Sequence, residues 1–197
     1  MPDLLLEPLP TIWAGRDIDP DFRPMVWLAN AYARGVPDAH PLPFAEDACR
    51  RFYRDGVFGM QQLQDAYRAL LEFYLGGGEE PTGSGSRSSG PDTIALDYKT
   101  DAPYIVAAFQ QVYGIDLTTA RVHWWRFKAL LRGLPEDCLF SRILHWRTAD
   151  LTELSPGERK RYEEMREIFA LPPEVKGGAR HAVTLAEHNE QFFDRFR

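Results

Sequence analysis

Apolar residues recur every three or four positions through most of the chain, which is the spacing that places them on one face of an α-helix. This pattern predicts a helix over residues 21–35, with Gly35 as its stop, and two further helices over residues 44–54 and 60–75. We expect the last two to form a helical hairpin.

The same spacing continues in the second half of the chain. Asp101 stands where its side chain can cap a helix whose apolar stripe includes Phe109. Two more helices are predicted over residues 116–134 and 135–148, because Pro135 breaks the pattern between them.

Two capping boxes predict where the last two helices begin. The first is Ser155-Pro156-Gly157-Glu158, which also has proline at the first helical position. We expect its helix to bury Tyr162, Met165 and Phe169. The second box, from Thr184 to Glu187, opens a C-terminal helix that carries Phe192, Phe193 and Phe196.

The remaining segments lack helical spacing. Residues 1–20 alternate short apolar runs with turn-forming residues, which favours an N-terminal hairpin or an extended arm. Residues 76–92 are rich in Gly and Ser and predict a flexible loop, and the short piece at residues 93–98 is compatible with a strand. The pattern therefore predicts a mainly α protein with a single compact multi-helix domain at residues 21–172, followed by a linker and helix at residues 173–197.

Composition narrows the classes of function. The chain of 197 residues is 44% hydrophobic and 26% charged, which is typical of a chain that folds around a core. Its formal net charge of -6 disfavours a general attraction to nucleic acid phosphates, because like charges repel. No stretch approaches the roughly 20 apolar residues of a membrane span, and the N-terminal run lacks the basic leader of a signal peptide. We expect no membrane association and a location in the cytoplasm.

The polar residues form no pattern typical of catalysis or metal binding. None of the five histidines belongs to a His-Glu-x-x-His motif, and acidic pairs such as Glu163-Glu164 point in different directions on a helix. The cysteines, Cys49 and Cys138, lie far apart and outside any Cys-x-x-Cys pair, so we expect reduced, packed thiols. The sequence predicts a protein that is not an enzyme and that uses no metal and no cofactor.

The most informative segment runs from Gly114 to Leu151, GIDLTTARVHWWRFKALLRGLPEDCLFSRILHWRTADL. If the residues after Asp116 are helical, successive residues turn by about 100° and two strips result. With Phe109 of the preceding helix, the first strip is expected to form core and carries Trp124, Phe127, Leu130, Leu131 and Leu134. The second strip carries Arg121, Trp125, Lys128 and Arg132.

A tryptophan among three cations allows three interpretations. Another helix of the same protein can cover Trp125 while the cations stack on its ring and keep their charges in water. Alternatively, Trp125 and the cations form a docking surface, because Trp and Arg often dominate protein interfaces. Interleaved basic and aromatic residues also suit single-stranded nucleic acid, which the acidic net charge disfavours.

At these residues the chain resembles a known family. HWWRFKALLRGLPED, FSRILHWRTADL and the charged helix that ends in FALP are similar to segments of the small tailed-phage proteins grouped as the gene-product-fifteen family. DFRP at residues 21–24 and DAPYIVAAFQQVYGIDL at residues 101–117 resemble its other recurrent segments. The resemblance spans most of residues 21–172 and is most specific at residues 123–134, where a histidine and a basic residue frame the double tryptophan.

The resemblance implies a product of the phage tail module. Its expected role is tail assembly in the cytoplasm of the bacterial host, as a chaperone or scaffold for the tape-measure or tail-tube protein, and self-association is a further expectation. The contact surface on this hypothesis consists of Arg121, Trp125, Lys128 and Arg132. The alternatives are a structural tail component that stays in the virion and a nucleic-acid-binding accessory protein.

Overall fold

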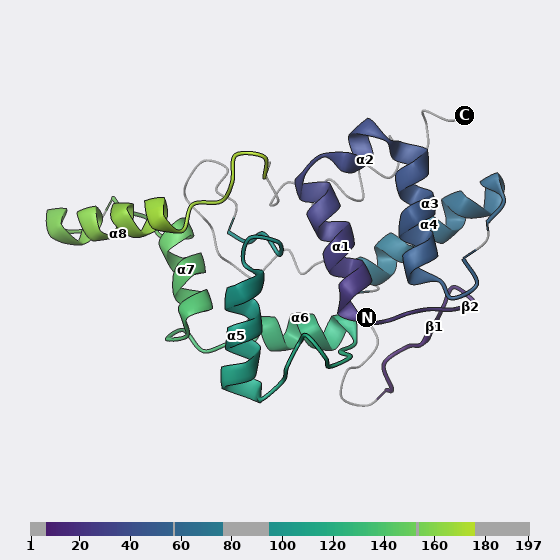
Figure 1. Cartoon of the computed structure of the whole chain (residues 1–197), viewed down its shortest axis with the longest axis horizontal. Helices are drawn as coiled ribbons and strands as arrows, with labels where there is room; N and C mark the ends of the chain where they lie inside the picture. Colours follow the sequence, from purple (N-terminus) through teal and green to yellow (C-terminus); the bar gives the residue numbers. More distant parts are fainter. Residues whose placement is uncertain (1–6, 57, 77–94, 153, 176–197) are drawn as a thin grey trace.

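The computed structural model describes residues 7–56, 58–76, 95–152 and 154–175, and these form a short hairpin and a set of helices (Figure 1). The elements are β1 (Ile12–Trp13), β2 (Arg16–Asp17), α1 (Phe22–Ala33), α2 (Val36–Ala39), α3 (Pro41–Phe52), α4 (Met60–Leu75), α5 (Ala102–Tyr113), α6 (Trp124–Arg132), α7 (Leu139–Thr148) and α8 (Pro156–Ile168). The prediction of a mainly α protein with an N-terminal hairpin is confirmed. None of the helices in these ranges combines the length and apolar character that crossing a membrane requires.

The N-terminal hairpin follows from its turn residues. Strand β1 pairs antiparallel with β2, with Ile12 opposite Asp17 and Trp13 opposite Arg16. The two residues of the turn, Ala14 and Gly15, both have positive φ angles, of 50° and 75°. Two successive positive φ angles are typical of the tight turns whose twist matches that of the paired strands.

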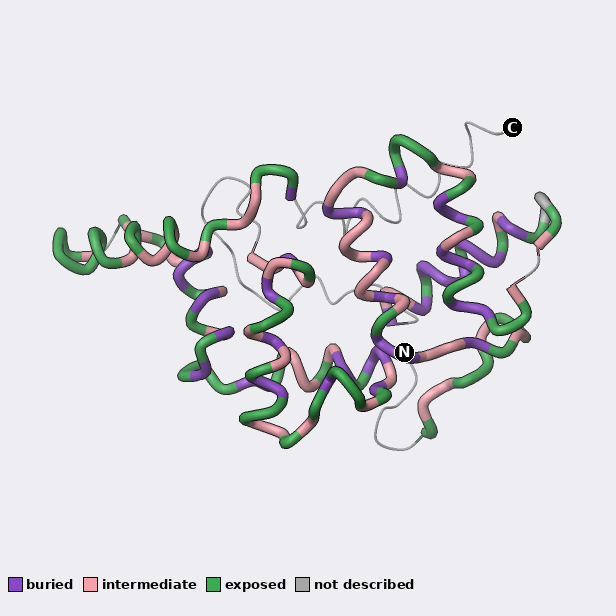
Figure 2. Tube along the Cα trace, viewed as in Figure 1, coloured by how far each residue is buried: buried purple, intermediate pink, exposed green. Residues whose placement is uncertain are grey.

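The helices divide into two groups that α6 connects (Figure 1). Helix α3 packs against α1, α2 and α4, whereas α5 packs against α7 and α7 against α8. Helix α6 contacts both α1 and α5. Figure 2 shows the contrast in burial between the inner faces of α3 and α4 and the helix α8, which projects from the rest and has no buried residue.

A continuous aromatic core occupies the junction around α6. Phe127 stacks on Phe22 of α1 with ring centroids 4.6 Å apart, and on Phe109 of α5 at 5.2 Å. Its third stacked neighbour is Trp124, at 5.8 Å. Because Phe127 touches rings from both groups of helices, its side chain joins the two halves of the molecule.

Two ion pairs with buried carboxylates lie at the start of α5. Asp101 accepts two hydrogen bonds of 2.8 Å from the Arg147 guanidinium, and Asp97 accepts two of 2.9 Å from Arg34. The two carboxylates are linked, since the Asp97 amide also donates to Asp101. Asp101 is the N-cap residue of α5, as predicted, but its side chain makes no capping hydrogen bond, because this carboxylate pairs with the buried Arg147 instead.

The predicted helix over residues 116–134 is also wrong in its first half, since α6 begins only at Trp124. Tertiary contacts hold the preceding segment in turns. The Arg23 guanidinium donates to the carbonyls of Leu117, Thr118 and Ala120. The Val122 carbonyl accepts from the Phe22 amide, so it is not available to a helix.

Smaller differences concern the later helices and one strand. Helix α7 begins at Leu139, with Cys138 as its cap, and not at Pro135. Helix α8 has the expected Ser155 capping box, but the residues predicted to be buried there are only half-buried: Tyr162, Met165 and Phe169. Residues 95–98 form no strand, and α2 was not predicted. Most of the predicted 76–92 loop and the helix after Thr184 lie outside the described residues.

Candidate functional site

The double tryptophan at the start of α6 closes the end of α4. The Trp124 Nε1 donates to the Tyr74 carbonyl and the Trp125 Nε1 to the Phe73 carbonyl, each at 2.8 Å. The Lys128 ammonium donates to the Tyr74 carbonyl as well, at 2.9 Å. The last carbonyls of a helix lack the usual partner one turn further on, so Trp124 and Lys128 supply donors to the Tyr74 carbonyl. Trp125 adds a second donor to the Phe73 carbonyl, which also accepts from the Gly76 amide. The pair of tryptophans is therefore a structural clamp.

Trp125 consequently does not belong to a docking surface. Its side chain is only 1% exposed. The Phe73 ring lies 5.0 Å away and the Trp13 ring of the hairpin 5.7 Å away. The interpretation in which the protein's own elements cover Trp125 is the one that the structure shows. Among the predicted cations, Lys128 rests on the neighbouring ring instead, with its Nζ 5.3 Å from the centre of Trp124.

The structure does not bring Arg121 together with the other cations of the predicted strip. Arg121 lies before α6 and pairs with Asp19, and its side chain is 66% exposed. A continuous strip would require a helix through residues 116–123, which is absent there. Of the predicted cations, Lys128 and Arg132 lie one turn apart on α6.

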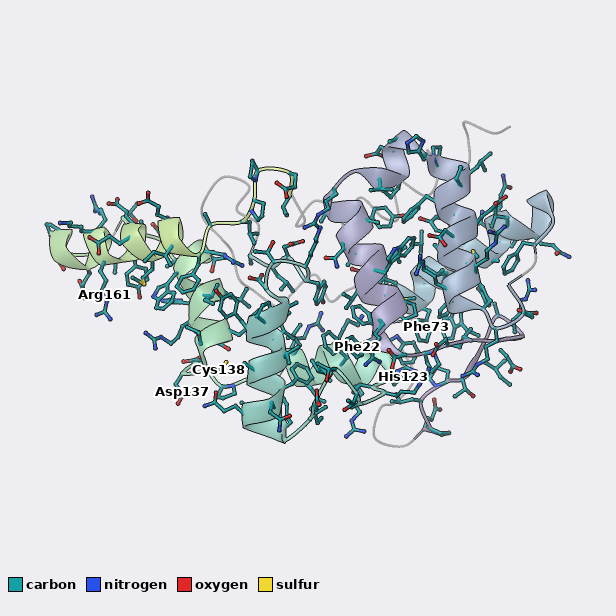
Figure 3. All side chains as sticks on the ribbon, in the orientation of Figure 1. Phe22, Phe73, His123, Asp137, Cys138 and Arg161 are labelled. Atoms are coloured by element: carbon teal, nitrogen blue, oxygen red, sulfur yellow. The ribbon has the colours of Figure 1, made fainter. Side chains whose placement is uncertain are left out.

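His123 fixes the entry into α6. Its Nδ1 accepts from the Trp125 amide at 3.1 Å, and its Nε2 lies 3.2 Å from the Pro10 carbonyl. Since a carbonyl only accepts, this pair of contacts requires a neutral ring with the proton on Nε2. Burial lowers the pKa of His123, in agreement with a neutral ring. Figure 3 shows His123 with Phe73 and Phe22 at the junction of the helices, and Arg161 far from it on α8.

An open pocket lies between α6 and α7, with a volume of about 390 Å³. We call it the α6–α7 pocket. The residues that line it come from the end of α4, from residues 96–98, from α6 and its C-terminal turn, and from α7: Tyr74, Leu96, Tyr98, Trp124, Lys128, Leu131, Arg132, Leu134, Phe140, Ser141 and Leu144. Its volume falls within the range of pockets that hold a small ligand or a few anchoring side chains.

Apolar side chains dominate the lining. Five of these are half-buried and present part of their surface: Tyr74, Leu96, Tyr98, Leu131 and Leu144. Leu131 was predicted to be core and lies at this edge instead, whereas Phe109, Trp124 and Phe127 are at most 1% exposed. The sequence pattern did not reveal Leu96, Tyr98 or Leu144 as neighbours of α6, because only the fold brings these segments together.

The described residues offer little reactive chemistry. Within the ranges given above, no three His, Cys, Asp or Glu side chains stand close enough to hold a metal ion. Burial raises the pKa of the Cys49 thiol to about 12, so it is unreactive at neutral pH. The Cys138 sulfur accepts from the Ser141 amide and serves as the cap of α7.

The fold and the pocket first define a class of protein: a small, mainly helical protein whose described residues form an open pocket lined by apolar side chains and two cations. The chain matches the family described as Bacteriophage Gp15 protein over residues 61–171, which is more than half of its length. The protein belongs to this phage family, as its resemblance at residues 123–134 predicts. No match was found among curated proteins or among solved structures.

Proposed function

We propose that this phage protein acts in tail assembly as a non-catalytic chaperone or scaffold, and that it binds the tape-measure protein through the α6–α7 pocket. One observation supports the choice of site. Every residue that lines the pocket lies between Tyr74 and Leu144, inside the span of 61–171 that matches the family. The part of the chain common to the family is thus also the part that builds the pocket.

Partly exposed apolar side chains would drive binding at the pocket. Half-buried leucines and tyrosines around an open pocket favour binding, because a partner that removes their remaining surface from water lowers the free energy of the system. A helix with one apolar face is the partner that such a hollow fits, since one or two side chains can enter as anchors. A tape-measure protein with long amphipathic helices would be held apart from other copies until the tail tube forms around it. This activity requires no bond to be made or broken.

Co-expression with the tape-measure protein tests the proposal. We expect the full chain to raise the soluble fraction of the tape-measure protein and to co-purify with it. Leu144→Lys, which places a charge in the pocket, should reduce co-purification at least tenfold. The matched control is Ile168→Lys, because Ile168 is 65% exposed on α8, outside the pocket. Circular dichroism checks that both variants stay folded. If both bind the tape-measure protein equally well, the α6–α7 pocket is not the binding site.

The rival role, a structural tail component, differs in what remains in the particle. A chaperone leaves once assembly is complete, so mass spectrometry of purified virions should find little of this chain relative to the tail-tube protein. Its retention at a fixed copy number per virion would favour the structural role.

A further inference from the structure

Helix α8 packs against α7 along one of its faces. Arg166 donates to the Trp146 carbonyl, and Phe169, which directly follows the helix, stacks on the Trp146 ring. The Tyr162 hydroxyl lies 3.1 Å from the His145 Nε2. The three α8-side residues are three or four positions apart, so they share a face. Because α8 projects from the other helices (Figure 1), its opposite face is left exposed.

That opposite face carries a stripe of four exposed residues, which we call the α8 outer stripe. It consists of Gly157, Arg161, Glu164 and Ile168. Steps of four, three and four residues keep the stripe along one line of the helix surface, since each residue turns by about 100°. The stripe combines an open backbone position, two opposite charges and a large apolar side chain that is 65% exposed.

The order of residues in the α8 outer stripe is complementary to its own reverse. When two copies of α8 run antiparallel about a two-fold axis through the middle of the stripe, Arg161 lies opposite Glu164 of the second copy. The same axis places Gly157 opposite Ile168 of the second copy. A parallel pair would instead bring each charge against its like. The charges therefore favour an antiparallel pair of copies.

The local structure has room for these contacts. A Cβ atom at Gly157 would meet none of the described atoms within 4 Å, so the Ile168 side chain of a second copy can lie against this backbone. Glu164 is 57% exposed and lies 4.0 Å from Lys160 of its own helix. Its two carboxylate oxygens can accept from Arg161 of the second copy as well.

The charges beside the stripe are complementary in the same arrangement. Lys160 and Glu167 lie along one edge of the α8 outer stripe, two turns apart, and both are exposed. The two-fold axis sets this edge against the same edge of the second copy, where Lys160 is nearly level with Glu167. Exposed ion pairs contribute little to affinity, but they select the direction of the pair.

We propose that the protein forms an antiparallel dimer through the α8 outer stripes of two copies. The inference goes beyond the proposed function, because none of the described residues that line the α6–α7 pocket belongs to α8. A helix of 13 residues is only about 20 Å long, so the contact is small and the dimer is weak. The interface is the same patch on both copies, so assembly stops at two.

Exchanging the two charges of the stripe tests the dimer. Sedimentation velocity of the full chain should show a monomer–dimer equilibrium at micromolar concentrations. Arg161→Glu and Glu164→Arg each set like charges opposite one another, and each should weaken the dimer by about tenfold or more. A mixture of the two variants should dimerise again, because each then supplies the charge that the other lacks. The double variant Arg161→Glu/Glu164→Arg should also recover the dimer.

The matched control is Glu163→Arg. It changes the charge by the same amount as Glu164→Arg at an exposed neighbour that lies about 100° around the helix, outside the stripe. Circular dichroism confirms that each variant is folded. A wild-type chain that stays monomeric at every concentration, an equal loss in Glu163→Arg, or a mixture that does not recover would each overturn the inference.

Self-association and partner binding can be measured separately. Ile168→Lys should weaken the dimer, because it replaces the apolar contact with Gly157 by a charge. The same variant should keep its co-purification with the tape-measure protein, since α8 is not part of the described pocket lining. A dimer that survives Ile168→Lys unchanged would overturn the inference and leave the proposed function intact.

Discussion

Individual side chains at the start of α6 perform several structural tasks at once. His123 caps the helix, and the two indoles that follow donate to successive carbonyls at the end of α4. A net contribution of about 1 kcal/mol is usual for each such hydrogen bond, and burial of the rings contributes more. The most distinctive motif of the sequence therefore stabilises the fold on which the pocket is built.

Trp125→Ala should strongly destabilise the protein. The substitution removes a ring that is 1% exposed together with its hydrogen bond to Phe73, and loss of a buried aromatic costs about 3–5 kcal/mol. Urea unfolding followed by circular dichroism measures the change. Arg121→Ala is the comparison, since its exposed side chain should contribute no more than about 0.5 kcal/mol. If Trp125→Ala were as stable as the unchanged protein, the tryptophan pair would not be what stabilises the contact between α6 and α4.

His123 should make stability depend on pH between 7 and 5. Burial lowers its pKa in the folded state, so the unfolded chain takes up a proton more readily than the native protein. Stability is then fully present above the unfolded value of about 6.5 and is lost as pH falls through the folded pKa. His123→Asn keeps an acceptor for the Trp125 amide but cannot titrate. We expect urea midpoints of this variant to fall less between pH 7 and 5, and an identical fall would exclude His123 as the cause.

At the scale of elements, buried charges fix how α1, α5 and α7 meet. Arg34 follows α1, Asp97 and Asp101 precede α5, and Arg147 lies on α7. Burial opposes ionisation of Asp97, but hydrogen bonds from Arg34 and Thr100 outweigh it and lower the pKa of this carboxyl. Because a buried charge without its partner is costly, this network penalises any other arrangement of the three helices.

Removing either partner of the Asp101–Arg147 pair should therefore strongly lower the free energy of unfolding. We expect Asp101→Ala and Arg147→Met each to cost about 3–5 kcal/mol, because each leaves an uncompensated charge in the interior. The double variant should cost less than the sum of the two single variants, which urea unfolding of all three measures. Arg50→Met, which breaks an exposed pair with Glu46, should cost at most about 1 kcal/mol. Additive losses would show that the two side chains are not coupled.

At the scale of the whole molecule, one core runs through both groups of helices. The buried cluster includes Cys49 of α3 in the first group and Cys138, the cap of α7, in the second. Phe127 links them through its stacks on Phe22 and Phe109. We therefore expect the described helices to unfold as one cooperative unit.

The two thiols report on that cooperativity. Both are buried, so neither should react with an aromatic disulfide reagent in native buffer at pH 8. In increasing urea, labelling of Cys49 and Cys138, resolved by mass spectrometry of peptides, should rise in one transition that coincides with the loss of near-ultraviolet circular dichroism. Labelling of Cys138 at clearly lower urea than Cys49 would show instead that α5–α8 unfold separately.

Local sequence determined most of the helices in this protein. Apolar spacing located α1, α3, α4 and α5, and the Ser155 capping box located α8, because these signals act within a few residues of one another. The same residues carried the resemblance to the phage family. The signals failed at residues 116–123, where the backbone carbonyls accept from Arg23, which lies 94 to 97 residues earlier in the chain.

The tertiary structure decided which of the distinctive residues are on the surface. Spacing places Trp125 among cations, but Phe73 and Trp13 cover it, and neither belongs to its helix. The α6–α7 pocket likewise combines four segments that are separated along the chain. The spacing of apolar positions indicates which side chains are buried, whereas long-range packing determines which residues cover them. For that reason the fold class could be derived from sequence and the candidate site could not.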